Sequence, residues 1–295
     1  MSRTKALFII NPNSGTRSKE QVPKLLYRYL DGHIDYDIVF TKYAGEATKI
    51  SNDNKGKFNL IVAVGGDGTI NEVARPLIDS ETALGIVPMG SGNGLARHLG
   101  IPLNLKKAII TFQRPEISTI DTIKVDDQAF LNVAGVGFDA HIASIFAKSK
   151  KRGFITYANL ALRELNKYRY AGYRLIIDGI EKTEKAPFIV SIANATQYGN
   201  NAHIAPGARI ADGLMDICIL QKVPFWYYPI LLFHLFNGTV YKSRYYHCAQ
   251  GKEVIIKRIS EDSENHFHLD GDPFDLKSDI KLTIKPLSLK VACRC

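Results

Sequence analysis

Three polar loops rich in glycine each follow a short run of aliphatic side chains in the first hundred residues. They are Asn11-Pro12-Asn13-Ser14-Gly15, Gly65-Gly66-Asp67-Gly68-Thr69 and Met89-Gly90-Ser91-Gly92-Asn93-Gly94. Without a Cβ, glycine lets backbone N–H groups approach phosphate oxygens closely. A carboxylate such as Asp67 does not suit a bare phosphate, but it can hold a Mg²⁺ ion that sits on that phosphate. The loops together predict a site for a nucleotide phosphate and a divalent cation.

The second loop gives the strongest of these signals. Thr69 is expected to act as the N-cap of a following helix, whose first N–H groups would also favour an anion. The plain structural alternative is a tight strand-to-helix turn. The two companion loops weigh against that alternative.

The elements before the loops indicate how the loops could meet. Short β-branched or aliphatic runs predict strands at Ala6–Asn11, Tyr36–Thr41, Asn59–Val64 and Leu84–Pro88. A helical pattern lies between the first two strands, with apolar side chains at Val22, Leu25, Leu26 and Tyr29. Such alternation predicts a doubly wound parallel sheet, in which ligands bind beyond the carboxyl ends of the strands. We therefore expect an α/β nucleotide-binding domain over residues 1–125.

After Asp121 the pattern changes to runs typical of strands. They lie at Arg174–Asp178, Glu181–Lys185, Phe188–Ala193, Met215–Leu220, Val254–Arg258, His266–Leu269 and Ile280–Ile284. These runs predict a second, mainly antiparallel β-sandwich-like domain over residues 126–285. The length of 295 residues suits two domains.

A further polar turn occurs late in the chain, at His268-Leu269-Asp270-Gly271-Asp272-Pro273. Asp-Gly between two strands is a standard hairpin signal, and the local sequence alone favours that interpretation. The functional alternative is a carboxylate at the turn, which accepts a proton from a substrate hydroxyl during phosphoryl transfer.

The order and spacing of these motifs resemble the diacylglycerol kinase / sphingosine kinase catalytic superfamily, and the small bacterial lipid kinases above all. The resemblance runs from about residue 6 to residue 276 and includes Asn132-Val133-Ala134-Gly135-Val136-Gly137-Phe138-Asp139-Ala140 and the segment Ala205–Asp216. It implies an ATP- and Mg²⁺-dependent lipid kinase with its ATP site between the two domains. It also implies that the tail, about 286–295, returns to the first domain, and that the second domain binds the lipid.

The resemblance assigns roles residue by residue. Asp270 matches the catalytic base, with Asp272 beside it and Asp67 in the phosphate and metal network. The nucleotide would contact Asn11, Gly65, Gly66, Asp67, Gly68, Thr69, Gly90, Ser91, Gly92 and Asn93. Asp67 and Asp121 would serve Mg²⁺, and Asp212 with the backbone of Leu214 would form a second, structural Mg²⁺ site.

Two positions depart from the family pattern. Gly94 stands where bacterial diacylglycerol kinases usually carry an aspartate, which weakens diacylglycerol as the expected substrate. Asp272 replaces the usual glutamate, so the charge is kept but the side chain is one methylene shorter.

Other nucleotide motifs are missing or unsupported. The chain has neither a P-loop nor the protein-kinase motif set. The segment Gly135–Ala140 fits G-x-G-x-x-A, but the region about 20 residues on is basic rather than acidic, so NAD binding is not expected there.

The net charge of +9 favours an anionic partner, and basic residues gather between Lys148 and Arg174. No nucleic-acid-binding module accompanies them, so nucleic acid is not expected. The four cysteines indicate ordinary thiols, and the short apolar run near the N-terminus does not make a signal peptide. We therefore expect a cytoplasmic protein that meets its lipid substrate by peripheral contact with a membrane surface.

One apolar segment, Phe225–Phe236, is too short to span a bilayer. Core packing is the favoured interpretation for it, with acyl-chain contact or membrane docking as the alternative. A homodimer is left open, since dimers are common among the relatives. Two other functions also stay open: an NAD kinase-like enzyme, and a non-catalytic lipid- or nucleotide-binding regulator with the same fold.

Overall fold

The structure is a computed structural model that describes residues 3–15, 19–149, 153–184, 186–259, 266–275 and 279–293. The chain divides into two compact units. Unit 1 comprises residues 1–122 and 287–295, and unit 2 comprises residues 123–286. Three members of the predicted basic stretch, Lys150, Lys151 and Arg152, lie outside the described residues.

Unit 1 is built on a parallel sheet, as predicted. Its strands follow the order β2 (Asp35–Phe40), β1 (Lys5–Ile10), β3 (Leu60–Gly65) and β4 (Ala83–Pro88). Every neighbouring pair is parallel, and each strand ends within one residue of the predicted run. β1, β3 and β4 are buried almost throughout, which explains why they appear as continuous apolar runs.

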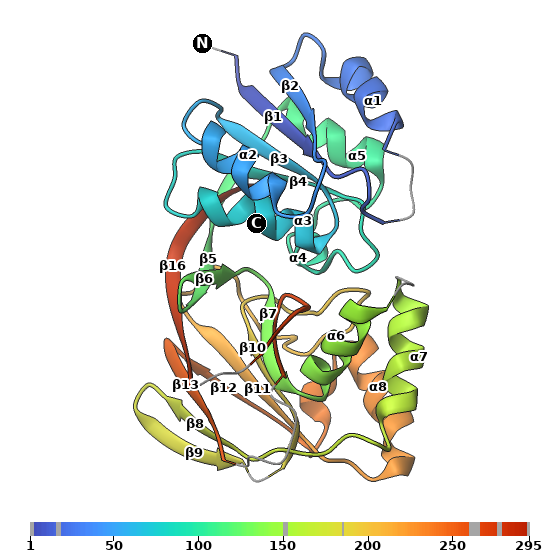
Figure 1. The fold of residues 1–295 in the computed structure, drawn as a ribbon. Helices are drawn as coiled ribbons and strands as arrows, with labels where there is room; N and C mark the ends of the chain where they lie inside the picture. Colours follow the sequence, from blue (N-terminus) through green and yellow to red (C-terminus); the bar gives the residue numbers. More distant parts are fainter. Residues whose placement is uncertain are drawn as a thin grey trace. The chain divides into compact units, whose positions relative to one another are not determined.

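Helices cover both faces of this sheet (Figure 1). One face carries α1 (Gln21–Leu30) and α5 (Leu105–Ile110), and the other carries α2 (Glu46–Asn54) and α3 (Asp67–Ala74). α1 buries Val22, Leu26 and Leu30 against the sheet, so the predicted helical pattern is confirmed. The short α4 (Gly94–His98) follows β4. The α/β doubly wound class is thus confirmed for unit 1.

Unit 2 contains two sheets. The first is antiparallel, in the order β12 (Tyr246–Gly251), β11 (Met215–Gln221), β10 (Pro187–Ala193), β7 (Val133–Gly137), β14 (His266–Leu269) and β15 (Asp272–Asp275). The second joins β9 (Ile180–Glu184), β8 (Tyr173–Ile177), β13 (Glu253–Arg258) and the start of β16 (Ile280–Ala292). β5 (Ile117–Val125) pairs with β16 and with β6 (Gln128–Phe130).

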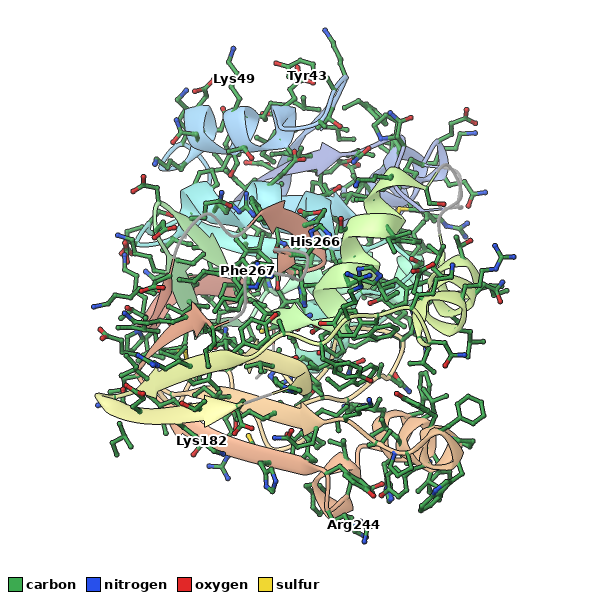
Figure 2. All side chains as sticks on the ribbon, turned by 60° about the horizontal axis from the view of Figure 1, so that its bottom comes forward. Tyr43, Lys49, Lys182, Arg244, His266 and Phe267 are labelled. Atoms are coloured by element: carbon green, nitrogen blue, oxygen red, sulfur yellow. The ribbon has the colours of Figure 1, made fainter. Side chains whose placement is uncertain are left out.

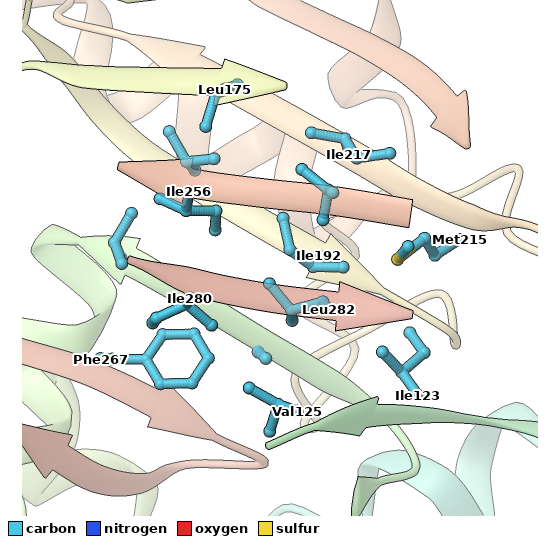
Figure 3. Close-up of a cluster of buried hydrophobic side chains, with 14 of the residues drawn as sticks. Ile123, Val125, Leu175, Ile192, Met215, Ile217, Ile256, Phe267, Ile280 and Leu282 are labelled. Carbon is cyan, nitrogen blue, oxygen red and sulfur yellow. The ribbon is translucent and has the colours of Figure 1, made fainter. Parts of the chain in front are cut away.

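A shared hydrophobic core holds the two sheets of unit 2 together (Figure 3). Ile192 and Ile217 reach it from the antiparallel sheet, while Leu175, Ile256 and Leu282 reach it from the second sheet. The opposite face of the antiparallel sheet packs against α6 (Phe138–Lys148), α7 (Phe154–Glu164) and α8 (Tyr228–Phe236). The predicted β-sandwich-like class is confirmed.

β16 belongs to both units. It pairs with β13 in unit 2, and further along Val291 pairs in parallel with Leu84 of β4 in unit 1. Among the described residues, no helix is both long and apolar enough to cross a membrane.

Phe112 offers a test of the core of unit 1. Its ring is buried, contacts the ring of Phe8 edge-on, and fills the space that Gly85 leaves open. We expect Phe112→Ala to lower the free energy of unfolding by about 3–5 kcal/mol, since the cavity cannot fully collapse. Phe40→Ala, which removes a half-exposed ring of β2, should cost less than about 1 kcal/mol in the same urea titration. Equal losses would contradict this assignment of the core.

Candidate active site

The three glycine loops of unit 1 come together, as the sequence predicted. The Asn11 side-chain amide donates a hydrogen bond to Thr69 Oγ1 at 3.0 Å, which joins the first loop to the second. A Cβ on Gly15 would lie 1.9 Å from the carbonyl oxygen of Met89, so the first loop also lies directly on the third. A Cβ on Gly90 would lie 2.6 Å from the Cα of Gly66. Only glycine permits this backbone-to-backbone approach.

The Asp67 carboxylate fixes the third loop against the second. Its Oδ2 accepts the backbone N–H of Asn93 at 2.9 Å, and its Oδ1 accepts that of Gly94 at 2.8 Å. Charge-assisted bonds of this kind are among the stronger hydrogen bonds in proteins. Gly94, the departure from the family pattern, therefore serves here as a backbone donor to Asp67.

The third loop also stabilises itself. Asn93 adopts a left-handed backbone conformation, with a φ of 51°, and its side chain accepts the N–H of Gly90 and donates to the Gly90 carbonyl. Arg97 donates from Nε to the Gly92 carbonyl at 3.0 Å. Ser91 lies exposed at the tip of the loop.

The second loop leads directly into α3, and here one prediction is wrong. Helix α3 begins at Asp67 with Gly66 in the N-cap position, so Thr69 lies inside the first turn and is not the N-cap. The glycine turn lets the helix start three residues earlier, and the Thr69 hydroxyl accepts from Asn11 instead. The first-turn N–H groups of a helix have no intrahelical acceptor. Among the described residues, a Cβ on Gly68 would meet no atom within 4 Å, so this part of the chain leaves space for a ligand at the turn.

Asp121, predicted to serve the metal network, is fully buried in β5 within unit 1. Its Oδ1 accepts the backbone N–H of Leu287 at 2.7 Å. Next to it, the hydroxyls of Thr122 and Ser288 share a hydrogen bond of 2.8 Å. Leu287 has a φ of 45°, which is unusual for a residue with a branched side chain. These bonds hold β16 at the point where it enters unit 1.

Asp270 lies in unit 2, at the two-residue turn between β14 and β15. Asp270 and Gly271 both have positive φ, as this class of hairpin turn requires, so the hairpin interpretation holds. The carboxylate is nevertheless engaged. Oδ1 accepts the backbone N–H groups of Asn132 and Val133 at 2.9 and 2.8 Å, and Oδ2 accepts that of Leu131 at 3.0 Å.

A carboxylate offers about four acceptor positions, two on each oxygen. Three of the four on Asp270 are occupied within the described residues, which leaves one on Oδ2. Burial raises the pKa of Asp270 above its ordinary value, while the three backbone N–H groups and His268 act in the opposite direction. The chain thus holds a carboxylate of increased basicity in one orientation, with one acceptor position left for a further hydrogen.

A buried polar network supports the same turn. His268 is 2% exposed, and its Nδ1 accepts the N–H of Gly271 at 3.3 Å. Its Nε2 therefore carries the proton, which it donates to Asp139 Oδ2 at 3.1 Å. That oxygen also accepts the hydroxyls of Tyr198, at 2.8 Å, and Ser191, at 3.3 Å. Burial and the nearby Asp139 raise the pKa of Tyr198 well above its ordinary value, so Tyr198 stays a neutral donor.

This network is the part of the site that sequence reasoning missed. The segment Asn132–Ala140 attracted attention as a family motif and as a false dinucleotide motif, but without a role for Asp139. The signal in the sequence is that Asp139 is the only polar side chain among the apolar and glycine residues from Val133 to Ala140. Gly135 makes room for it, since a Cβ there would lie 3.0 Å from Asp139 Oδ2 and 3.3 Å from His268 Nε2.

The remaining predicted residues also lie in unit 2. Asp272 begins β15 and is exposed. Asp212 is exposed, and its Oδ1 accepts the backbone N–H of Leu214 at 3.1 Å across Gly213, which has a φ of 73°. Over the described residues, no three His, Cys, Asp or Glu side chains gather closely enough to hold a metal ion by themselves. The metal-binding roles of Asp67, Asp121, Asp212 and Leu214 stay predictions.

A parallel α/β unit with converging glycine loops, followed by a β-sandwich unit, defines a two-unit phosphotransferase fold. Residues 5–125 match the family described as the diacylglycerol kinase catalytic domain, and residues 132–293 match the YegS C-terminal NAD kinase beta sandwich-like domain. The chain belongs to this diacylglycerol kinase and YegS family of lipid kinases. The resemblance seen in the sequence is thereby confirmed.

Individual relatives agree with this assignment. The chain is 32% identical to a diacylglycerol kinase of Bacillus subtilis (strain 168), over 74% of each sequence. It is 27% identical to a probable lipid kinase YegS-like of Klebsiella pneumoniae (strain 342), over 98% of this chain and 95% of the relative. The crystal structure of a diacylglycerol kinase from Bacillus anthracis str. Sterne covers the whole chain, and 98% of its own, with a TM-score of 0.77 at 20% identity. This last likeness supports the fold.

Gly90 gives a test of the loop contact. We expect Gly90→Ala to lower the free energy of unfolding by about 1–3 kcal/mol, because the new Cβ meets the Gly66 backbone, which cannot rotate away. Gly207→Ala is the matched control, since a Cβ there meets no atom of the described residues within 4 Å, and its effect should stay within about 0.5 kcal/mol. The stabilities of the two variants are compared by thermal unfolding. If the two variants melted alike, the close approach of the loops would be wrong.

Asp139 tests the buried network. Asp139→Ala leaves His268 and Tyr198 without their shared acceptor, and we expect a loss of about 3–5 kcal/mol in unfolding free energy. Asp53→Ala, at an exposed position of α2, should change it by less than about 0.5 kcal/mol. The measurement is a denaturant titration. A loss below 1 kcal/mol for Asp139→Ala would rule out the network as a structural support of the turn.

Proposed function

We propose that this protein transfers the γ-phosphate of ATP to a lipid hydroxyl in a Mg²⁺-dependent reaction, with diacylglycerol or a related lipid as acceptor. The observation that carries the proposal is the convergence of three glycine loops around the Asp67 carboxylate at the start of α3. The second support is the fixed carboxylate of Asp270.

In this proposal the loops of unit 1 hold the nucleotide phosphates. The N–H groups in the first turn of α3 favour an anion, and the helix dipole adds to that preference. Thr69 and Asn11 hold the first two loops together, so the donors are in place before the ligand arrives. Such preorganisation accounts for much of the catalysis in phosphoryl transfer.

The residues fit a Mg²⁺ ion held jointly with the phosphates. Mg²⁺ binds through one or two protein carboxylates together with phosphate oxygens and water, so a cluster of three protein ligands is not required. Asp67 supplies such a carboxylate at the start of α3, where its two oxygens also accept the N–H groups of the third loop. When bound, the ion would offset charge on the transferring phosphoryl group. We keep Asp121 as a second carboxylate of this network, and Asp212 with Leu214 as a separate structural Mg²⁺ site.

Asp270 is the proposed base. As the acceptor hydroxyl oxygen bonds to the γ-phosphorus, the bond between that phosphorus and the β–γ bridging oxygen breaks and ADP departs. The hydroxyl proton moves to Asp270 Oδ2, the oxygen with an acceptor position left. The backbone N–H groups of residues 131–133 fix the carboxylate, and its raised pKa improves it as a base.

The name of the Bacillus subtilis relative supports diacylglycerol as the first acceptor to try. Gly94 and Asp272 depart from the family pattern, so a sphingoid base and other hydroxyl lipids belong in the same panel. An NAD kinase-like activity and a regulator without catalysis are the two functions that the test must separate from this one.

The deciding experiment measures transfer of labelled γ-phosphate from ATP to a panel of hydroxyl lipids in mixed micelles, with and without Mg²⁺. NAD serves as the water-soluble acceptor control. A labelled phospholipid that requires Mg²⁺ supports the proposal and names the acceptor. Label on NAD alone would favour the NAD kinase-like enzyme. Nucleotide binding without any labelled product would favour the regulator.

We expect Asp270→Asn to lower kcat by about 10²–10⁴-fold, the usual range for a lost general base. Asp272→Asn should cost much less, since that side chain lies exposed at the start of β15. Only the ionised base is active, so activity falls as pH drops through its pKa. Because the pKa of Asp270 is raised, the acid limb of kcat/KM should lie above about 4, the ordinary aspartate value. An acid limb that is unchanged in Asp270→Asn would assign the base elsewhere.

A further inference from the structure

One helix of unit 2 is apolar on every side but buried on only one. α8 and the turn before it, η3 (Phe225–Tyr227), pack Leu231 and the half-buried Tyr227, Tyr228 and Leu235 against the antiparallel sheet. Leu231 is 2% exposed. Core packing, which the sequence favoured for this segment, is therefore correct for one face only.

The opposite face carries large apolar side chains into solvent. Phe225, Trp226 and Phe233 are 74%, 64% and 64% exposed, and the same face includes Ile230, Leu232 and Phe236. We call these six residues the α8 face. An exposed cluster of this kind marks an interaction site, because single scattered apolar residues are normal but contiguous ones are not.

The chain segment that carries the α8 face has charges of one sign. The chain contains no Asp or Glu from Lys222 to Lys252. Lys222, Lys242 and Arg244 are exposed, and their recorded partners are tyrosine rings and one tyrosine hydroxyl. Within the described residues none of the three forms an ion pair. Figure 2 shows Arg244 directed outward at the surface of unit 2.

We propose that the α8 face binds the surface of a bilayer that contains anionic lipids, with α8 lying in the plane of the headgroups. This inference rests on the proposed function, because a kinase for a membrane lipid must reach its acceptor at that surface. Aromatic and aliphatic side chains at the headgroup boundary, together with basic residues that face anionic lipids, are typical of interfacial helices.

The length of the segment fits that orientation. A helix over Phe225–Phe236 is about 18 Å long, well short of the ~30 Å hydrocarbon core of a bilayer. It can lie in the interface but cannot cross. Trp226 and the tyrosines near it suit the headgroup region, where an aromatic ring can be apolar at one end and hydrated at the other.

A second copy of this chain fits the α8 face less well. A two-fold interface sets the same patch against itself. Lys222, Lys242 and Arg244 of one copy would then approach those of the other without an acid from this segment between them. The like charges disfavour such a dimer, and they favour an anionic surface.

The chain carries its own reporter, because Trp226 is its sole tryptophan. We would titrate the full chain with vesicles of phosphatidylglycerol and phosphatidylcholine, without ATP, and follow the emission of Trp226. Burial at the headgroup boundary should shift the emission to shorter wavelength, and lipids brominated on the acyl chain should quench it. Vesicles of phosphatidylcholine alone should bind at least tenfold more weakly.

Two double variants test the two halves of the interaction and keep the reporter. Phe225→Ser with Phe233→Ser should weaken vesicle binding by about tenfold or more. Its control is Tyr27→Ser with Ile180→Ser, which removes two equally exposed apolar side chains from other elements. Lys242→Gln with Arg244→Gln should remove most of the preference for phosphatidylglycerol. Lys24→Gln with Lys49→Gln, which makes the same change in net charge, should not.

Several outcomes would overturn the inference. Emission that does not respond to any vesicle would exclude the α8 face as a membrane contact, and so would equal losses in the test and control variants. Equal binding to vesicles with phosphatidylglycerol and to vesicles of phosphatidylcholine alone would show that the α8 face does not prefer anionic lipids. An emission shift that grows with protein concentration in the absence of vesicles, together with a dimer mass, would make this face a contact between two copies.

The kinase assay separates this inference from the proposed function. A short-chain diacylglycerol dispersed below its micelle concentration needs no bilayer. If the protein phosphorylates that lipid but does not bind vesicles, the α8 inference fails alone. If it binds vesicles but phosphorylates no lipid, the proposed function fails, and the inference that the α8 face binds a membrane surface is kept.

Discussion

The arrangement of unit 1 depends on one carboxylate bound by backbone N–H groups. Asp67 receives the N–H groups of Asn93 and Gly94, and this contact holds the third loop in place. The bond forms only because Gly66 and Gly90 let two backbones approach closely. Charge-assisted bonds of this kind stabilise the carboxylate and the loop together. The loops can therefore keep their polar side toward a ligand and still be rigid.

Unit 2 uses the same physical device for a different task. Asp270 is held by the N–H groups of three successive residues, 131–133, and its turn is supported from below by His268 and Asp139. Asp67 fixes a loop, whereas Asp270 is itself fixed. The second arrangement orients the carboxylate that we propose as the base, and burial raises the pKa of that carboxylate.

The sequence predicted those features that depend on long apolar runs. The strands β1, β3 and β4 are nearly continuous and buried, so their ends, and hence the meeting of the loops, followed from pattern alone. No long apolar run marks β7, which contains glycines, or the buried polar part of β5 at Asp121. Backbone donors such as Gly94 and Leu131 leave no mark on residue type, so the partners of Asp67 and Asp270 could not be predicted. Neither could the exposed side of α8, because which face of an apolar helix is covered depends on its neighbours.

The path of β16 has a consequence for the order in which the protein is made. The ribosome releases most of unit 1 first, and amino-terminal units usually fold as they emerge. Here the edge of that unit next to β4, and the partners of Asp121 and Thr122, are residues 287–293. Of these two units, the one that leaves the ribosome earlier is thus completed later. It must wait, with one edge uncovered, for the whole of unit 2 to be synthesised.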